Sequence, residues 1–420
     1  MRAAVLTAGC RLNQAESDAL SAWLLARGDE LVSDPAAADV CYVNTCTVTG
    51  EADRSSVKLI RRVGRLRPRP RIVVMGCLAE RGADRLRELD GVSEVWSGRD
   101  KREAIAGLVP AGTRSRALLK VQDGCDRGCA YCVSGRVRGA PESAAPEAVE
   151  GAVAELTDRG YHEVVLTGLN LGSYRHGRTG LAGLIARLLR SGRDFRLRLG
   201  SLEPDTVDDE LLAAVADRRV CPHFHLALQS ADDEVLTRMG RRYRFEEVRQ
   251  LVARLIALRA DACLGADVIS GLPGESRGAF EAGRDRLAGL PLAYLHAFTF
   301  SPRDGTPASR MPDQLGTAEA RRRTVELRSL SAEFSRRYAS RFIATVRPAV
   351  VESGREVVTD NYLRVRLRER APARVRQSCE VLVEGVIDRA GSSPLRGLTG
   401  TALARSSAGE AGPGANKEDR

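Results

Sequence analysis

The sequence has few aromatic residues and no long apolar run. Phe, Trp and Tyr make up 4% of its 420 residues, so stacking of nucleic-acid bases on aromatic rings would be limited to a few positions. No apolar stretch approaches the ~20 residues that a membrane-crossing helix needs, which excludes an integral membrane protein. The apolar start, Met1 to Cys10, has no small-residue cleavage site and is predicted to be a β-strand rather than a signal peptide. We therefore expect a cytoplasmic protein without a membrane partner.

Acidic residues are outnumbered, because the net charge is +10 and nearly all of the cations are arginine. This balance favours a polyanionic partner, with nucleic acid as the first candidate. The alternative is a GC-rich genome that uses arginine wherever a solvated cation serves. Two stretches concentrate the charge: the acid-free segment from Lys58 to Arg71, which could follow an RNA backbone, and a C-terminal group that would share one face of a strand. That group is Arg364, Arg366, Arg368, Arg370, Arg374 and Arg376. A solvated surface is the alternative for both.

Residues 1–112 alternate strand and helix patterns, which predicts a doubly wound parallel sheet. Three cysteines, here called the strand-end set, each follow a predicted strand. In open α/β sheets, ligands gather at the carboxyl ends of the strands, so these cysteines should converge; three independent core thiols are the alternative. The predicted strands are Ala3–Ala8, Val40–Asn44, Ile72–Met75 and Val92–Trp96, and the strand-end set is Cys10, Cys46 and Cys77.

Residues 113–340 repeat this alternation about six times, which predicts a partial or complete parallel barrel, a (βα)6 TIM-like arrangement. A charged helix is expected at Arg321–Arg341. Residues 341–405 carry short β-type runs broken by turn residues and predict a small C-terminal β-barrel. Residues 406–420 should be a disordered tail. The six predicted barrel strands are Ala117–Val121, Glu163–Leu166, Arg196–Leu199, Phe224–Leu228, Leu264–Ile269 and Tyr294–Phe300.

A second group of cysteines, the loop set, is Cys125, Cys129 and Cys132, in the loop after the first barrel strand. In the cytoplasm, such thiols are better explained as metal ligands than as disulfides. Three thiolates leave one iron of a [4Fe-4S] cluster open, and the amino and carboxylate groups of S-adenosylmethionine are the obvious ligands for it. Zinc fits poorly, because structural zinc takes four ligands and this loop contains no fourth Cys or His.

Seven segments together resemble the tRNA methylthiotransferases of the radical S-adenosylmethionine superfamily, over nearly the whole chain. They are Thr7–Gln14, Asn44–Thr49, Met75–Cys77, Val121–Cys125, Leu199–Pro204, His225–Ser230 and Gly271–Glu275. The resemblance implies three parts: an N-terminal domain with an auxiliary cluster, a radical S-adenosylmethionine core and a C-terminal TRAM-like RNA-binding module. It also implies two [4Fe-4S] clusters, with the two cysteine sets as metal ligands.

The implied reaction is methylthiolation of an adenine at C2. A deoxyadenosyl radical would activate C2, the strand-end set would hold the cluster that supplies sulfur, and two S-adenosylmethionine molecules would be used per turnover. No catalytic side chain is expected beyond the cluster ligands. The implied partners are the anticodon loop of tRNA, with no DNA, and an electron donor such as flavodoxin or ferredoxin.

Within the family, the segment Asn44–Arg54 resembles the branch that acts on N6-threonylcarbamoyladenosine at tRNA position 37. The alternatives are isopentenyladenosine at the same position, a ribosomal-protein aspartate or, in another class, a non-catalytic RNA-binding iron–sulfur protein. Some residues depart from the common pattern. Ala8, Arg11 and Leu12 replace Leu, Lys and Val, Val133-Ser134-Gly135 replaces two aliphatic residues and Pro, and Ala227 and Ala231 replace Pro and Gly.

Polar residues and glycines at other barrel strand ends are candidates for binding S-adenosylmethionine. They are Thr167, Gly168, Ser201, Glu203, Gln229, Gly271 and Gly274. Glu203 could instead be an acidic residue that stabilises the N-terminus of a helix. The two glycines of the Gly271–Glu275 loop could instead form an ordinary turn without contacting the cofactor. His225 and His296 lie in predicted barrel strands and are expected to be hydrogen-bonded and structural.

Overall fold

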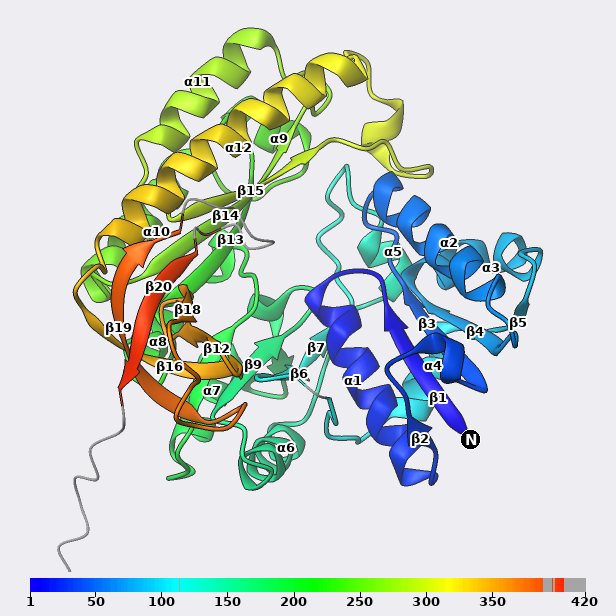
Figure 1. The fold of residues 1–420 in the computed structure, drawn as a ribbon. Helices are drawn as coiled ribbons and strands as arrows, with labels where there is room; N and C mark the ends of the chain where they lie inside the picture. Colours follow the sequence, from blue (N-terminus) through cyan, green and yellow to red (C-terminus); the bar gives the residue numbers. More distant parts are fainter. Residues whose placement is uncertain (113, 388–394, 396, 404–420) are drawn as a thin grey trace, which may run out of the picture.

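The computed structural model describes residues 1–112, 114–387, 395 and 397–403, so the predicted tail at 406–420 lies outside the described residues. Figure 1 shows an N-terminal sheet domain, a central barrel and a small C-terminal β-barrel in chain order. This α/β architecture confirms the predicted fold class. Every described helix is too short or too polar to cross a membrane.

The N-terminal sheet is parallel throughout, with the order β2-β1-β3-β4-β5. Its apolar residues form a core on each face. In a doubly wound sheet of this order, the connections reverse direction between the first and third strands, and ligands bind at the carboxyl ends there. The elements are β1 (Arg2–Thr7), α1 (Arg11–Ala26), β2 (Glu30–Leu31), η1 (Pro35–Ala37), β3 (Val40–Thr45), α2 (Gly50–Gly64), β4 (Arg71–Gly76), α3 (Cys77–Arg87), β5 (Val92–Val95) and α4 (Gly98–Ile105).

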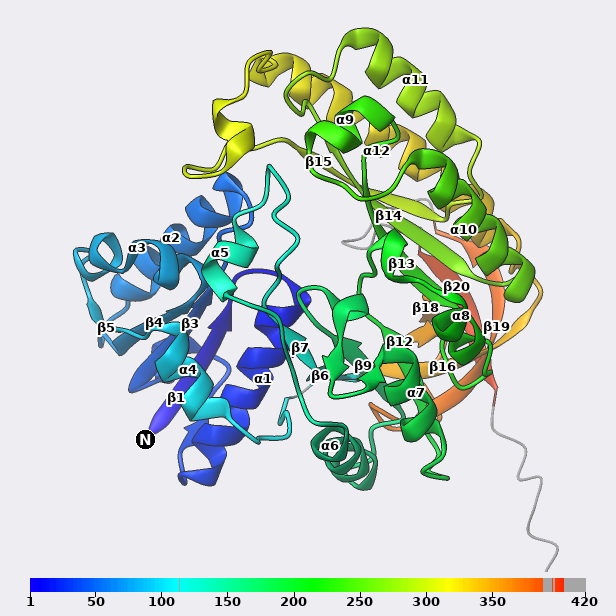
Figure 2. The same ribbon diagram turned by 180° about the vertical axis from the view of Figure 1, so that it is seen from behind.

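Six parallel strands form the central barrel in two three-stranded sheets, β6-β9-β12 and β13-β14-β15. Single bridges, Leu197 to Val220 and Leu202 to Leu226, join the two sheets. Among the described residues, β15 does not pair with β6, so the barrel is open, and α1 packs against β6 beside this opening. Figure 2 shows the same neighbours from behind. The strands are β6 (Ala117–Lys120), β9 (Glu163–Thr167), β12 (Arg196–Leu199), β13 (His223–Gln229), β14 (Cys263–Ser270) and β15 (Tyr294–Thr299).

Helices cover the outside of the barrel strands, and their apolar faces form the largest core of the molecule. These helices are α6 (Pro146–Asp158), α7 (Leu181–Leu189), α8 (Asp209–Val215), α9 (Asp233–Arg238), α10 (Phe245–Leu258), α11 (Arg277–Ala288) and α12 (Thr317–Ser340). Helix α5 (Ser134–Arg138) instead packs against α3 of the N-terminal domain. Short connections contain β7 (Gln122–Asp123), β8 (Glu142–Ser143), β10 (Arg175–His176), β11 (Thr179–Gly180), η2 (Leu171–Ser173), η3 (Pro204–Thr206) and η4 (Pro307–Arg310).

The C-terminal strands close into a barrel in the order β16-β17-β18-β20-β19. Its core is continuous with residues of the central barrel, including Cys263 and Tyr294. The strands are β16 (Val346–Ser353), β17 (Glu356–Thr359), β18 (Arg364–Leu367), β19 (Ser378–Val386) and β20 (Leu398–Leu403).

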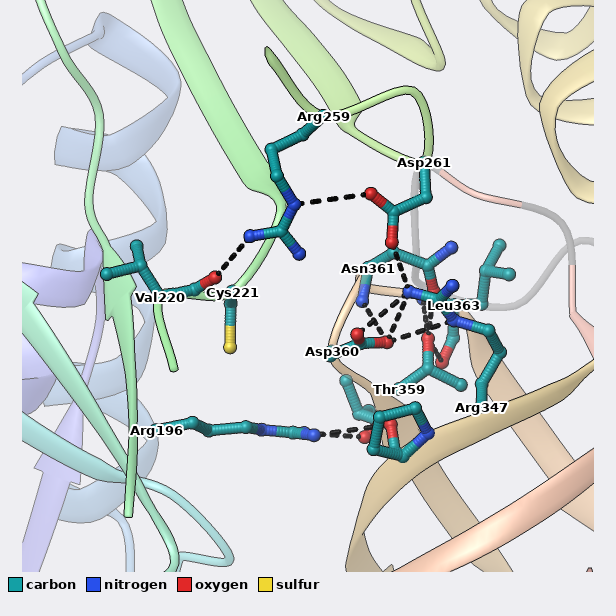
Figure 3. Close-up of polar contacts among 12 residues, drawn as sticks. Arg196, Val220, Cys221, Arg259, Asp261, Arg347, Thr359, Asp360, Asn361 and Leu363 are labelled. Atoms are coloured by element: carbon teal, nitrogen blue, oxygen red, sulfur yellow. Dashed lines mark hydrogen bonds and ion pairs between the residues drawn. The ribbon is translucent and has the colours of Figure 1, made fainter. Parts of the chain in front are cut away.

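Polar contacts fix the C-terminal barrel to the end of the central barrel at which its strands begin (Figure 3). Arg347 binds Asp261 at 2.7 Å and Asp360 at 2.8 Å. Arg196, the first residue of β12, donates to the carbonyl oxygens of Pro348 at 3.2 Å and Val358 at 3.1 Å. The turn after β17 is thereby held against the central barrel.

Candidate functional site

The strand-end set converges because the register of β1, β3 and β4 brings their ends together. Thr7 pairs with Asn44 and Thr45 pairs with Gly76, so the residues that follow these strands are neighbours. A Cβ on Gly9 would lie 2.7 Å from the Cβ of Cys46. The thiols also influence one another electrostatically, since Cys10 and Cys77 both raise the pKa of Cys46. The predicted convergence is what the fold produces.

A buried polar network holds these strand ends in place. The Asn13 side-chain amide donates to the Asn44 side-chain oxygen and to the Thr45 carbonyl oxygen, both at 3.0 Å. The Asn44 amide donates in return to the Asn13 carbonyl oxygen at 2.9 Å and to Ser17 Oγ at 3.1 Å. All of these side chains are buried. Because buried polar groups are costly unless paired, this network fixes the loops that carry the cysteines.

Burial raises the pKa of two thiols of the strand-end set, Cys46 and Cys10, in the metal-free protein. It raises the pKa of Cys46 to about 11. The pKa of Cys10 is also raised, mainly by desolvation, although part of this residue remains exposed, and the charge of Arg138 opposes the shift. A bound cation would favour the thiolates of this set.

The loop set lies between β7 and α5, in a loop held by backbone contacts. Cys125 N–H donates to the Gly139 carbonyl oxygen at 3.1 Å, and Cys132 N–H donates to the Cys129 carbonyl oxygen at 3.0 Å. Gly124 has a φ of +72°, and a Cβ there would overlap the Ala140 carbonyl oxygen. The three cysteines line a cavity of about 430 Å³.

Donors approach the sulfur atoms of the loop set. Arg241 donates to Cys129 Sγ at 3.1 Å and also binds Glu203, while Ser134 N–H donates to Cys132 Sγ at 3.4 Å. Cationic and N–H donors stabilise thiolates and the negative charge of a thiolate-bound cluster. This donor set fits an iron–sulfur cluster with one iron left open.

Arg138 joins the two cysteine sets. It lies at the end of α5, which follows the loop set, and its Nε donates to Cys77 Sγ at 3.3 Å. Its other nitrogens bind Glu16 at 2.8 Å and Asp123 at 3.1 Å. Burial opposes ionisation of Glu16, but Lys101, Arg138 and Lys120 outweigh it and hold its pKa well below the usual range. The two sets thus belong to one charged, buried assembly.

Comparison with known proteins gives two family matches along the chain. Residues 2–98 match the family model described as "Uncharacterized protein family UPF0004", and residues 119–286 match that of the "Radical SAM superfamily". The "Threonylcarbamoyladenosine tRNA methylthiotransferase MtaB" of Thermotoga maritima is 32% identical over 373 residues, which cover 82% of this chain and 85% of that protein. The protein of the same name from Bacillus subtilis is 32% identical over 400 residues, covering 86% and 88%.

This chain belongs to the methylthiotransferase family of radical S-adenosylmethionine enzymes. Among solved structures, the radical S-adenosylmethionine methyltransferase TsrM of Kitasatospora setae has a TM-score of 0.57 at 16% identity, covering 73% of this chain and 77% of that one. That likeness concerns the fold alone. The family membership confirms an iron–sulfur enzyme that uses S-adenosylmethionine.

The candidate S-adenosylmethionine residues of this methylthiotransferase differ in what surrounds them. Ser201 is exposed and Gln229 is half-buried, whereas Thr167 is buried at the end of β9. Glu203 is bound to Arg241, which links it to Cys129. A Cβ on Gly168 would lie 2.7 Å from Gln122 Oε1.

The two glycines of the predicted cofactor loop meet protein atoms. A Cβ on Gly271 would lie 2.5 Å from the Cβ of Ala320 in α12, and a Cβ on Gly274 would overlap the Arg238 guanidinium. Both residues have positive φ values. Within the same loop, Glu275 accepts from Gly271 N–H at 2.7 Å and binds Arg323 at 2.8 Å. These contacts favour the alternative of a structural turn.

Gln122 is a positioning residue that the motifs did not single out. Its amide nitrogen donates to the Gly124 carbonyl oxygen at 2.8 Å, beside Cys125, and its oxygen accepts from Asn170 N–H at 2.8 Å. It therefore joins the loop set to the end of β9. The sequence motifs did not indicate Arg138 or Arg241 either, because neither residue lies between the cysteines of the loop set. For Arg138, its position six residues after Cys132 was the one sequence feature that could have indicated a role.

The basic segment after Cys46 contributes to a surface groove between α2 and α3. Cations from both helices line it: Lys58, Arg61, Arg62, Arg65, Arg81 and Arg85. The last arginines of the basic segment Lys58–Arg71 do not line this groove. Arg69 pairs with Asp90, and Arg71 pairs with Glu94. The groove is the main cationic surface of the N-terminal domain near the strand-end set.

The expectation of one arginine face in the C-terminal barrel was too broad. Strand β18 ends at Leu367, so only Arg364 and Arg366 alternate on it. Arg368 follows the strand and pairs with Glu384 at 2.8 Å. Arg376 donates to the Gly112 carbonyl oxygen at 2.6 Å, which gives it a role between domains.

His225 and His296 share Asp267 in the barrel interior. His225 Nε2 lies 2.9 Å from Asp267 Oδ1, and His296 Nδ1 lies 3.4 Å from the same oxygen. His225 Nδ1 is 3.0 Å from the Tyr294 hydroxyl. The expected hydrogen bonding of these histidines is present.

Proposed function

We propose that this enzyme methylthiolates C2 of N6-threonylcarbamoyladenosine at position 37 of tRNA, in the cytoplasm. The observation that carries the proposal is the pair of three-cysteine sets joined by Arg138. A generic radical enzyme needs the loop set alone, whereas sulfur insertion needs a second site next to it. The printed names of the relatives and the segment Asn44–Arg54 support this substrate.

Cys125, Cys129 and Cys132 would hold one [4Fe-4S] cluster, and Cys10, Cys46 and Cys77 a second. When bound, the clusters and S-adenosylmethionine supply the radical and the sulfur that the reaction needs. Arg241 stabilises thiolate charge in the loop set and Arg138 does so in the strand-end set. Ser201 is the exposed member of the candidates for binding S-adenosylmethionine, and Gln229, which is half-buried, is a second candidate.

The RNA would lie along the groove of α2 and α3, with its anticodon loop towards the strand-end set. Phosphates are bound mainly by Lys and Arg, and this groove presents seven such cations beside Arg303, because Arg54 lines it together with the six named above. Arg303 itself is buried and binds Asp53 at 2.5 Å and Thr47 at 2.8 Å, so it holds the segment after Cys46 against the barrel. A reductant such as flavodoxin or ferredoxin would supply electrons.

The test is the nucleoside content of tRNA from a strain that lacks this gene. Mass spectrometry should find N6-threonylcarbamoyladenosine without its 2-methylthio form. The wild-type gene should restore that form, whereas a gene with Cys46→Ala should not. Persistence of the 2-methylthio form in the deletion strain would contradict the proposal, and loss of 2-methylthio-isopentenyladenosine instead would assign the enzyme to the other tRNA branch.

A further inference from the structure

Arg11 is a cation without an anionic partner beside the strand-end set. It is the first residue of α1 and directly follows Cys10. Its guanidinium donates to the Tyr362 hydroxyl at 2.7 Å, and among the described residues no carboxylate lies within ion-pair distance of it. The residue is partly exposed. This side chain therefore runs from the strand-end set into the central barrel, where it meets the C-terminal module.

Tyr362 is the residue that the C-terminal module inserts into the barrel. Hydrogen bonds among Thr359, Asp360 and Asn361 shape its turn (Figure 3), and Arg198 of the central barrel donates to the Thr359 carbonyl oxygen at 3.0 Å. The Tyr362 ring stacks on His223 with centroids 3.9 Å apart. Three guanidinium groups surround it, with their central carbons 5.5, 5.9 and 5.3 Å from its centroid; they belong to Arg11, Arg116 and Arg198.

This part of the barrel holds more positive charge than its carboxylates balance. Glu163 binds Arg198 at 2.6 Å and Arg196 at 2.7 Å. Glu352 accepts from Arg116 at 2.9 Å and also pairs with Arg364 at 3.0 Å. Asp267, another carboxylate in the interior of the central barrel, already interacts with His225 and His296. Arg11 is left as the excess charge.

Buried polar atoms without a hydrogen-bond partner lie around Tyr362, where positive charge is already in excess. Arg198 NH1, Arg116 Nε and His223 Nδ1 are buried without a hydrogen-bond partner. Burial opposes ionisation of Tyr362, but Arg11, Arg116 and Arg198 outweigh it and lower the pKa of this phenol. Because a buried charge is costly unless it is paired, this environment favours an anionic ligand.

We propose that Arg11 binds the carboxylate of the N6-threonylcarbamoyl group of the target adenosine. This inference rests on the proposed function and adds the residue that recognises the substrate. N6 is attached to C6, and C2 and C6 are both bonded to N1 on one edge of the adenine ring, so a base with C2 at the strand-end set would place its N6 substituent close by, in the space beside Cys10. A guanidinium and a carboxylate form a strong charge-assisted hydrogen bond. An isopentenyl group would leave Arg11 unpaired.

Aromatic side chains on β15 offer a surface on which the target base could stack. Tyr294, His296 and Phe298 share the face of β15 that points away from α12, because Leu295 and Ala297 pack in the helix-covered core. Phe298 is 43% exposed, which is unusual for an aromatic side chain in a chain with few of them. Its ring centroid lies 6.4 Å from that of His296. The base would stack there while its substituent reaches Arg11.

The test measures equilibrium binding by the reconstituted holoenzyme under anaerobic conditions, without S-adenosylmethionine, so that no turnover occurs. The probes are two anticodon stem-loop RNAs, one with N6-threonylcarbamoyladenosine and one in which the threonine carboxylate is a carboxamide. The wild type should bind the carboxylate RNA more tightly by about 10- to 100-fold, the range of a hydrogen bond to a charged group. Arg11→Gln should bind both RNAs alike, and Arg11→Lys should keep part of the preference.

Arg27→Gln, at the other end of α1 and paired with Asp29, is the matched control and should keep the full preference. Iron content and circular dichroism verify that the Arg11 variants are folded and loaded. A preference that survives in Arg11→Gln would overturn this inference, and so would a wild type that binds both RNAs equally. Neither result would affect the proposed function, which fails only if the nucleoside analysis of the deletion strain shows no change in 2-methylthio-threonylcarbamoyladenosine.

Discussion

The two cysteine sets each bring three thiols together, but by different routes. The loop set occupies eight consecutive residues, from Cys125 to Cys132, and depends on local turns. The strand-end set spans residues 10 to 77 and depends on the pairing of three strands and on the buried network of Asn13 and Asn44. We therefore expect that a local change can disrupt the loop set alone, whereas a change that disturbs the N-terminal sheet would also disrupt the strand-end set.

The prediction with the largest expected effect compares two single variants, each of which lacks one cysteine of one set. The wild type should contain about eight irons per chain, four for each cluster. Cys129→Ala and Cys46→Ala should each leave about four. Cys129→Ala should abolish release of 5′-deoxyadenosine, whereas Cys46→Ala should retain it but form no methylthio product. Equal loss of 5′-deoxyadenosine in both variants would show that the two sets are not independent. Iron analysis and chromatography of the products provide the readouts.

Two glycines next to the cysteines of the loop set form a matched pair for substitution. Gly124→Ala should destroy the loop cluster, because a Cβ would overlap the Ala140 carbonyl oxygen. Gly128→Ala has a similar φ of +67° but nothing within 4 Å of its Cβ, so it should cost only the roughly 1–2 kcal/mol of a left-handed backbone. Iron content and thermal unfolding distinguish the two. The strand-end cluster should survive in both; its loss in Gly124→Ala would contradict local independence.

Glu16→Gln tests the charged assembly that joins the two sets. It leaves Arg138, Lys101 and Lys120 without their shared carboxylate and should lower the free energy of unfolding by about 3–5 kcal/mol at neutral pH. The native pKa of Glu16 is depressed, so its stabilisation is complete above the unfolded value of ~4.3 and is lost as the pH falls below that value. Denaturant unfolding of metal-free protein should therefore show the two proteins converging in acid. A constant difference down to pH ~2 would contradict the assignment.

The smallest expected effect comes from Asn44→Ala, which removes one member of the polar network. Unpaired Asn13 and Ser17 groups should cost about 1–3 kcal/mol. Retention of iron should fall for the strand-end cluster and stay unchanged for the loop cluster. Thr299, whose hydroxyl bonds Thr324 of α12 rather than a residue of the polar network, offers a control in Thr299→Val. If both clusters lose iron equally in Asn44→Ala, the network serves general stability rather than the strand-end set.

Much of the fold could be predicted because the buried strands are short apolar runs that end in turn residues or cysteine. All six barrel strands lie where the pattern predicted them, within a few residues. Six of the described strands escaped prediction. Five of them, β2, β7, β8, β10 and β11, have two residues each and are too short for a periodic pattern, and β20 is interrupted by Gly400. The domain boundaries near residues 112 and 340 stay predictions.

For the candidate site, the sequence indicated the cysteines but not the side chains that hold or link them. Arg138 touches Cys77 across 61 residues, and Arg11 touches Tyr362 across 351. No local pattern encodes such contacts, because they depend on how whole domains pack. The glycine loop at Gly271 shows the converse case, since a family motif suggested a cofactor contact where the packing of α12 supplies a sufficient reason for the glycine.

Helix α1 has a consequence for how the chain folds during synthesis. Its Ala15 forms one small core with Leu118 and Val165 of the barrel, so a helix from the N-terminal domain covers the β6 side of the open barrel. The N-terminal domain leaves the ribosome first and can fold as a unit. The barrel strands made afterwards would assemble against a surface that already exists, and a barrel produced without residues 1–112 would expose that apolar edge to solvent and tend to aggregate.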